Sequence, residues 1–349
     1  MDNPRPKHIA RTQKRKHLRL SLLILLHVLA IAAGLNLFAL FHHVIPYYST
    51  PAVTPVPLTA PTPPPTPSPL PGPEETPPPA TEAPVSESAA PHLGSGERWS
   101  ETFADKFTDG EVIQTDNSYR SAHICVELQR VEEENLVYLI AEIYVSDLKY
   151  LRTAFGENDF GSRGMTADIA AGHNAVVAIS GDHYYARAEG VVVRNGMLWR
   201  TTRFEDVCVL LEDGRMLTMD NASFDLDAVS QLGVWQIWSF GPMLLQNGQA
   251  MEDFTSTVTV ANPRSAIGYV EPGHYFFVQV DGRGGNNSRG MTMRELSQLF
   301  ESLGCETAYN LDGGATAGMS WQGELLSYPY GRPVCDIIYV SDHPEDAED

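Results

Sequence analysis

Prolines concentrate in one segment of this chain and limit which part of it can fold. Residues 46–96 contain 17 of the 25 prolines, together with Thr, Ser and Ala. Proline fixes φ and has no backbone N–H to donate, so such a segment is predicted to form neither helix nor sheet ladders. We therefore expect a Pro/Thr-rich linker over residues 42–96 and a folded domain over residues 99–342.

An apolar run precedes the linker. Residues 20–41 carry no formal charge; as a helix they would extend about 33 Å, enough to cross a bilayer core of about 30 Å. Residues 1–19 carry seven Lys/Arg and one acid. The positive-inside rule then predicts a basic cytoplasmic tail, a transmembrane anchor and an extracellular domain, that is, a single-pass protein of the cell membrane. A cleaved signal peptide is the alternative, because small residues occur at 30–33.

The remainder of the chain is acidic. The formal net charge is −20 although the first 19 residues are basic, which argues against binding to nucleic acid. No pattern indicates an oligomeric state. Four cysteines follow the apolar run, at spacings too wide for a zinc ribbon: Cys125, Cys208, Cys305 and Cys335. A Cys305–Cys335 disulfide and free buried thiols both remain open.

Short apolar runs between turn residues indicate that residues 99–342 are mainly β-sheet. The runs 122–131 and 136–145 flank a charged turn and predict a hairpin. Asn195-Gly196 and Asp213-Gly214 predict two more. Further strands are predicted at 174–180, 234–240, 274–280 and 336–340.

Helices are fewer than strands in this prediction. A helix is expected over residues 292–304, with Thr292 and Glu295 forming a capping box at its start. A short one is expected over residues 165–171. The predicted fold class is α+β, a single domain with a mixed central β-sheet and few helices.

Four motifs place polar residues and glycines beside predicted strands: ISGDHYY (179–185), NPRSAIG (262–268), VDGRGG (280–285) and NLDGG (310–314). Each alone is typical of a tight turn, but together they favour a pocket. Asn310 and Asp312 point to the same side of a short apolar strand, where buried polar groups require partners or a ligand. A lone Arg264 in an apolar run calls for an acidic or phosphate partner.

These motifs, in this order, resemble the phosphodiester glycosidase family, over residues 138–340. The resemblance implies hydrolysis of the bond between a sugar anomeric carbon and phosphate. The substrate would be of the N-acetylglucosamine-1-phosphodiester type, in cell-surface or exopolysaccharide material. It implies no cofactor, and no motif demands a metal, although the aspartates could hold a divalent ion.

The resemblance also implies roles for individual residues. Candidate catalytic groups are Asp312 and Asp281, as nucleophile or general base, and Glu295, which the capping box alone also explains. Arg264 and Arg283 would bind the phosphate. The other implied substrate-binding residues are Asn310, Gly313, Gly314, Thr316, Gly181 and Asp182, and His183 adjoins them in the pocket wall.

Two departures from the family pattern stand in this sequence. Ser180 replaces the usual Asn, and ATAGM (315–319) stands where the family has another Gly, one or two Ser and Thr-Met. They motivate an alternative of another class, a non-catalytic protein that binds wall glycan or phosphodiesters with a degenerate pocket.

Overall fold

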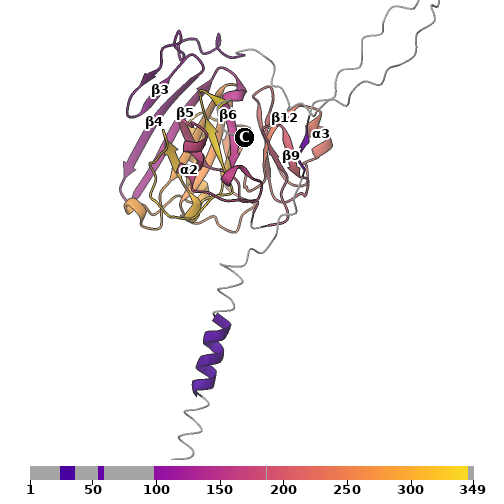
Figure 1. Cartoon of the computed structure of the whole chain (residues 1–349), viewed down its shortest axis with the longest axis vertical. Coiled ribbons are helices and arrows are strands. Elements are labelled where there is room, and N and C mark those ends of the chain that lie inside the picture. The colour runs from indigo at the N-terminus through magenta and orange to yellow at the C-terminus, as the bar shows by residue number, and fades with distance from the viewer. Residues whose placement is uncertain (1–23, 36–53, 59–97, 186, 345–349) are drawn as a thin grey trace, which may run out of the picture. The chain divides into compact units, whose positions relative to one another are not determined.

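The computed structural model describes residues 24–35, 54–58, 98–185 and 187–344 (Figure 1). It divides into two compact units, residues 1–49 and 50–349. In the first unit, residues 24–35 form a helix of exposed residues. The rest of the predicted anchor, the basic tail and most of the predicted linker lie outside the described residues. Within the described ranges, no helix combines the length and apolarity needed to span a membrane.

Part of the proline-rich segment does join a sheet. Strand β1 (Val56–Pro57) pairs antiparallel with β9 (Met197–Arg200), and Leu58 N–H donates to the Gly196 carbonyl at 2.9 Å. The prediction that this segment forms no sheet ladder is therefore wrong at these residues. The physical reason is that β1 is an edge strand, where proline is tolerated because one side needs no ladder donor.

The largest sheet has seven strands. They are β2 (Ile113–Gln114), β3 (Ser118–Arg120), β4 (Ile124–Glu133), β5 (Leu136–Val145), β15 (Arg264–Glu271), β16 (His274–Val280) and β17 (Thr307–Leu311). Across the sheet their order is β17-β15-β16-β5-β4-β3-β2. The strands β3, β4 and β5 stand at one side of the domain in Figure 1.

Two further sheets complete the core architecture. The five-stranded sheet contains β6 (Leu151–Phe155), β7 (Val177–Ser180), β18 (Met319–Trp321), β19 (Glu324–Leu325) and β20 (Asp336–Val340), in the order β19-β18-β7-β20-β6. The six-stranded sheet adds β8 (Val192–Arg194), β10 (Val207–Leu211), β11 (Met216–Met219) and β12 (Val234–Trp238), in the order β1-β9-β8-β12-β10-β11. A small hairpin joins β13 (Leu245–Gln246) and β14 (Gln249–Ala250).

All strand pairs among the described residues are antiparallel. The α+β single domain with few helices is confirmed, but three larger sheets replace the one mixed central sheet. The predicted hairpins β4–β5, β8–β9 and β10–β11 all form. Tight turns of this kind join antiparallel neighbours, whereas parallel neighbours need crossovers of a dozen or more residues.

One α-helix covers the outer face of each larger sheet. These helices are α2 (Thr166–Gly172), α3 (Leu226–Ser230) and α4 (Met293–Ser302). Leu296 and Phe300 of α4 pack on Val278 and other residues of the seven-stranded sheet. Its start is the predicted capping box, in which Thr292 and Glu295 satisfy each other's backbone N–H groups.

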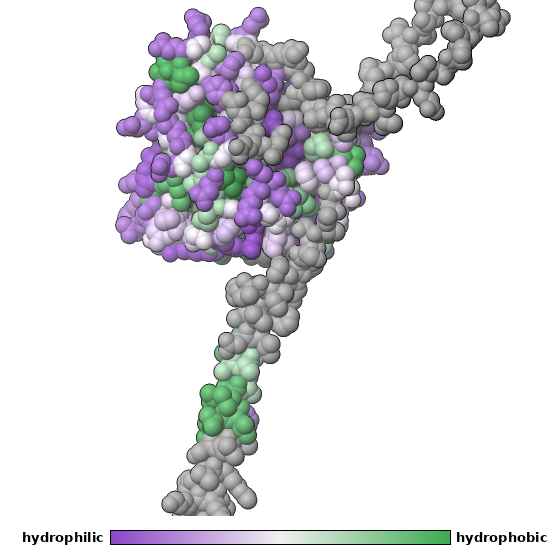
Figure 2. Space-filling view, in the orientation of Figure 1, coloured by the Kyte–Doolittle hydropathy of each residue, from purple (hydrophilic) through white to green (hydrophobic). Residues whose placement is uncertain are grey.

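The inner faces of the three sheets share one hydrophobic core. Ile143 and Phe277 of the seven-stranded sheet meet Ile179 and Ile338 of the five-stranded sheet and Trp238 of the six-stranded sheet. Hydrophilic residues dominate the face of this unit shown in Figure 2, with scattered apolar ones. All four cysteines are free and buried, so the structure realises the thiol alternative rather than the Cys305–Cys335 disulfide.

Candidate functional site

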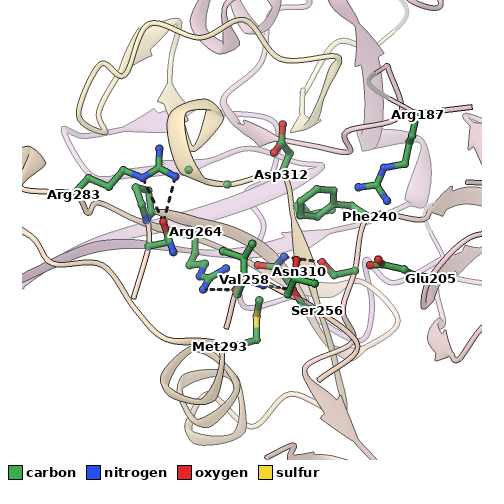
Figure 3. A pocket seen from close by; sticks show the side chains of 17 residues that line it. Arg187, Glu205, Phe240, Ser256, Val258, Arg264, Arg283, Met293, Asn310 and Asp312 are labelled. Carbon is green, nitrogen blue, oxygen red and sulfur yellow. Dashed lines mark hydrogen bonds between the residues drawn. The ribbon is translucent and has the colours of Figure 1, made fainter. Parts of the chain in front are cut away.

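A cavity of about 290 Å³ lies where β17 ends and β15 begins (Figure 3). Four of the sequence motifs contribute to this region or support it. The cavity is lined by Arg187, Glu205, Phe240, Gly241, Ser256, Thr257, Val258, Asn262, Pro263, Arg264, Arg283, Met293, Asn310, Leu311, Asp312, Gly313 and Gly314. Arginine, carboxylate and amide groups therefore face one small volume.

Arg264, the first residue of β15, is 4% exposed and lines the cavity. Its guanidinium donates to the carbonyls of Met291 at 3.1 Å, Val258 at 2.9 Å and Val260 at 2.6 Å. No carboxylate of the described residues forms an ion pair with it. Burial, and next the charge of Arg283, lower its pKa to about 10. A buried cation with only neutral acceptors is a strong anion-binding element.

Arg283 lies on the same side of the cavity. Its Nε and NH2 groups donate to Asn262 Oδ1 at 3.3 and 3.2 Å. Its backbone has φ of 55°, a conformation uncommon for a residue with a side chain, and this turn aims the side chain at the cavity. In Figure 3, Asp312 lies between Arg283 on one side and Arg187 on the other.

Asn310 and Asp312 both line the cavity from the end of β17, as their spacing of two predicts. Asn310 Nδ2 donates to the Gly241 carbonyl at 2.8 Å. Its Oδ1 is buried and has no hydrogen-bond partner among the described residues, although the residue is only 2% exposed. An unsatisfied buried acceptor at a cavity wall is a group that a ligand hydroxyl or amide would satisfy.

His183 contacts the carboxylate of Asp312. Its Nδ1 lies 3.0 Å from Asp312 Oδ2, close enough for an ion pair when the imidazole is protonated, while the angles fall short of a hydrogen bond. The ring also packs edge-on against Phe240, with 6.2 Å between centroids. The backbone N–H of Asp312 donates to the Gly181 carbonyl at 2.8 Å. The first motif therefore orients the last one.

Gly181 and Asp182 support the site from behind and do not line the cavity. Asp182 accepts from the backbone N–H groups of His183 at 2.7 Å and Ser239 at 2.9 Å, and it pairs with Arg194 at 3.2 Å. A Cβ at Gly181 would lie 2.3 Å from an oxygen of Asp336, so only glycine fits there. These residues fix the loop that carries His183.

Asp336 is the centre of this support. Its carboxylate accepts from Arg194 Nε at 2.7 Å and from the backbone N–H of Asp182 at 2.7 Å. Burial raises the pKa of Asp336, and the neighbouring Arg194 opposes that rise. The sequence alone did not single out Arg194 or Asp336, because the contacts that join them to the first motif cross 12 to 154 residues of chain.

Asp281 lies outside the cavity lining, and its carboxylate is occupied. It accepts from Gln279 Nε2 at 3.0 Å, from Asn286 Nδ2 at 2.6 Å and from the backbone N–H of Tyr328 at 3.0 Å. At 1% exposure it has no room for a substrate. The geometry gives Asp281 a structural position rather than the predicted catalytic one.

Glu295 also lies outside the cavity. It closes the capping box and forms a bidentate pair with Arg289, at 2.7 and 3.0 Å. The Arg289 guanidinium is the main reason that the pKa of Glu295 falls to about 2. These contacts explain the residue without catalysis.

The glycines and the hydroxyl of the last motif have separate positions. Gly313 and Gly314 line the cavity, and a Cβ at Gly313 would lie 2.6 Å from the Pro263 carbonyl oxygen. Thr316 is buried, and its hydroxyl donates to the Gly313 carbonyl at 2.6 Å. Thr316 therefore braces the loop from outside this cavity.

Among the lining residues that the sequence did not predict, three are charged or aromatic: Arg187, Glu205 and Phe240. All lie in irregular segments without a strand or helix period. The Arg187 guanidinium stacks on Phe204, 4.2 Å from the ring centroid, and on Phe240 at 5.3 Å. Burial raises the pKa of Glu205, and Arg187 lowers it. The only sequence signal was the presence of charged residues in loops that follow the first motif.

The cavity thus combines three arginines with two carboxylates, Asp312 and Glu205. Such a set suits an anionic ligand with a polar, uncharged part. Among the described residues, no group of three or more His, Cys, Asp or Glu side chains is arranged to hold a metal ion.

Comparison with known proteins identifies the family. The phosphodiester glycosidase family model matches residues 173–341. This segment is a phosphodiester glycosidase domain. It contains every cavity residue described above, and the resemblance drawn from the motifs is confirmed.

Individual relatives also match parts of the chain. The SPbeta prophage-derived uncharacterized protein YomE of Bacillus subtilis (strain 168) is 28% identical over 201 residues, 54% of this chain and 31% of that protein. The N-acetylglucosamine-1-phosphodiester alpha-N-acetylglucosaminidase of Mus musculus is 26% identical over 172 residues, 40% of this chain and 33% of that enzyme. The chain therefore spans about one third of the length of these two relatives.

A solved structure shares the fold. The zebrafish N-acetylglucosamine-1-phosphodiester alpha-N-acetylglucosaminidase catalytic domain, auto-inhibited by its pro-peptide, superposes with a TM-score of 0.53 at 17% identity. The superposition covers 71% of this chain and 94% of that one. The phosphodiester glycosidase domain therefore has the sheet-rich α+β fold of that catalytic domain.

Proposed function

We propose that this protein hydrolyses the bond between a sugar anomeric carbon and phosphate, in substrates of the N-acetylglucosamine-1-phosphodiester type. The observation that carries the proposal is the pairing of opposite chemistries in one cavity. Arg264 offers a buried positive charge that forms no ion pair with a described carboxylate, and Asp312 offers a carboxylate that lines the same cavity. The arginine suits a phosphate group, and the carboxylate suits an electron-poor carbon.

The arginines bind and stabilise the leaving phosphate in this mechanism. As the bond from C1 to oxygen breaks, its electron pair moves to the phosphate oxygen, and the departing group becomes a phosphate monoester dianion. Arg264 and Arg283 oppose that growing charge in a site that is already arranged to receive it. Because phosphate is a good leaving group, protonation by a strong acid is less necessary than for an ordinary glycoside.

Asp312 acts at the sugar carbon. Its carboxylate either attacks C1 or takes the proton from the water that does so; in both cases water supplies the hydroxyl of the free sugar. The His183 imidazole lies 3.0 Å from this carboxylate and pairs with it when protonated. Glu205 is the second carboxylate of the cavity, and the rise in its pKa with burial suits a group that exchanges a proton with water.

Asn310 recognises the sugar. Its unsatisfied Oδ1 is an acceptor for the amide N–H or a hydroxyl of N-acetylglucosamine, while its Nδ2 is held by Gly241. A group fixed in this way discriminates against sugars that lack the matching donor, because its acceptor would then stay unpaired.

The proposed setting is the outside of a cell membrane, with cell-surface or exopolysaccharide material as the source of substrate. The support is the uncharged run at 20–41 behind a basic segment. Protease added to intact cells should remove the domain while a cytoplasmic marker survives; protection of the domain in intact cells would contradict this setting.

The test of the activity compares the full-length wild type with Asp312→Asn. Both are offered UDP-N-acetylglucosamine and a panel of alkyl N-acetylglucosamine-1-phosphodiesters, and free sugar is quantified. Loss of a positioned base or nucleophile is expected to lower release by at least about 100-fold. Asp213→Asn is the matched control, because Asp213 is an exposed carboxylate at a hairpin turn.

Each outcome has a defined meaning. Equal circular dichroism spectra establish that the variants fold alike. Equal release by wild type and Asp312→Asn would remove Asp312 from the mechanism. No release from any donor, with saturable binding of wall glycan, would favour the alternative, a non-catalytic glycan- or phosphodiester-binding protein.

A further inference from the structure

A second cavity, of about 250 Å³, lies on the other side of the 3₁₀ turn η5 (Gly314–Thr316). Gly314 lines the first cavity, and Ala315 and Thr316 line the second. The two cavities are therefore separated by one turn of chain. Gly314 belongs both to the wall of the first cavity and to the turn that borders the second.

Two tyrosines form one wall of the second cavity. Tyr328 and Tyr330 contact each other edge to face, with ring centroids 5.0 Å apart. Tyr328 is 40% exposed, a large value for a ring that is anchored on both sides. An exposed, immobilised aromatic ring offers an apolar face of the kind that the C–H face of a sugar ring covers.

The loop around Asp281 holds both tyrosines in place. Tyr328 N–H donates to the Asp281 carboxylate at 3.0 Å, and the Tyr328 ring lies so close to Gly285 that a Cβ there would be 2.7 Å from it. The Tyr330 hydroxyl both accepts from Gly282 N–H at 2.6 Å and donates to the Gly282 carbonyl at 2.9 Å. The same loop carries Arg283, so it lines the first cavity and supports the wall of the second.

Polar groups complete the second cavity. Asp168 and Arg332 line it and are exposed, and their side chains make no hydrogen bond or ion pair with any described residue. A carboxylate and a guanidinium that both stay free can each bind a pair of sugar hydroxyls. The small residues Ala315, Ala317 and Gly318, which belong to the segment that departs from the family pattern, leave the space open.

We infer that this second cavity is a subsite for a sugar of the glycan that remains attached to the phosphate, with Tyr328 as its stacking platform. Asp281 is then a positioning residue: it fixes Tyr328 and has no contact with substrate. The inference takes its substrate class from the proposed function. A lipid chain as the attached group is a competing occupant, which the free charges of Asp168 and Arg332 disfavour.

The kinetic test compares two donors in each full-length protein: a methyl N-acetylglucosamine-1-phosphodiester and one whose phosphate is attached to a mannose oligosaccharide. Tyr328→Ala is expected to lower the ratio of kcat/KM for the glycan-linked donor to that for the methyl donor about tenfold, the equivalent of one aromatic contact. Arg215→Ala, an exposed arginine far from both cavities in sequence, should leave the ratio unchanged. An unchanged ratio in Tyr328→Ala would overturn the inference.

A binding test keeps the inference separate from catalysis. Asp312→Asn protein is titrated with neutral tetrasaccharides of mannose, glucose and N-acetylglucosamine and, separately, with dodecyl phosphate. Binding is measured by calorimetry. Saturable binding of at least one tetrasaccharide to Asp312→Asn protein, and its loss in the double variant that also carries Tyr328→Ala, supports the subsite even if no donor is hydrolysed. Binding of dodecyl phosphate without any tetrasaccharide, or no binding at all, would refute it.

Discussion

Arg194 is the residue whose removal should most weaken the support of the site. Its guanidinium pairs with Asp182 at 3.2 Å and Asp336 at 2.7 Å, and all three side chains are at most 3% exposed. It also donates to the Val193 carbonyl at 3.0 Å and to that of Ile237. Without it, two buried carboxylates would lose their ion-pair partner.

The magnitude follows from the charges left behind. Removing one partner of a buried ion pair typically costs about 3–5 kcal/mol, because the remaining charge cannot be solvated. For a domain of this size each kcal/mol lowers Tm by roughly 2–4 °C, so Arg194→Met should lower it by roughly 6–20 °C. Adding Asp336→Asn should recover part of the loss, since one of the two stranded charges is removed.

In full-length protein, urea unfolding measures the loss in the free energy of unfolding, and thermal unfolding measures the shift in Tm; both are monitored by circular dichroism. Arg215→Met is the matched control, because Arg215 pairs with Asp213 at 2.7 Å but both side chains are about half exposed. Such a surface pair contributes only about 0–1 kcal/mol. If Arg194→Met were no more destabilising than Arg215→Met, or if Asp336→Asn recovered nothing, the reasoning would fail.

Three further predictions concern the surroundings of the site. Arg289 lowers the pKa of Glu295 from 4.5 to about 2. The ionised Glu295 side chain therefore stabilises the folded state fully above pH 4.5, and this contribution is lost as the pH falls toward 2. The side chain is 37% exposed, so Glu295→Gln should lose about 1 kcal/mol at pH 7 and nothing near pH 2; a difference that is constant with pH would contradict this. Gly313→Ala, whose Cβ would lie 2.6 Å from the Pro263 carbonyl oxygen, should lower sugar release at least about tenfold, whereas Gly172→Ala, with nothing within 4 Å, should not; equal effects would count against the tight loop. A thiol reagent should modify none of the four buried cysteines in native protein within minutes, and all four in urea without reductant; fewer than four in urea would reveal a disulfide.

Local chemistry predicted the parts of the fold that depend on neighbours in sequence. Asn195-Gly196 forms its hairpin with both residues at positive φ, 51° and 78°. The capping box of α4 follows from the spacing of Thr292 and Glu295. The pairing of Asn310 with Asp312 in one cavity follows from the period of a strand.

Tertiary contacts decided what the sequence left open. Asp281 and Asp312 both stand between the end of a strand and a glycine. The Asp281 carboxylate accepts hydrogen bonds from donors that include the backbone N–H of Tyr328, 47 residues away, whereas Asp312 lines a cavity. Arg187 and Glu205 reach that cavity from loops that have no period to read. Val56 joins a sheet edge although prolines flank it, because an edge strand needs only one row of hydrogen bonds.

The bond that is broken is the central claim, and isotope placement tests it directly. Wild-type protein is incubated with methyl N-acetylglucosamine-1-phosphodiester in ¹⁸O-labelled water, and both products are examined by mass spectrometry. If water supplies the oxygen at the anomeric carbon, ¹⁸O is expected in the released sugar and none in the methyl phosphate. Label in the phosphate instead would mean that the phosphorus–oxygen bond breaks, and would contradict the glycosidase account.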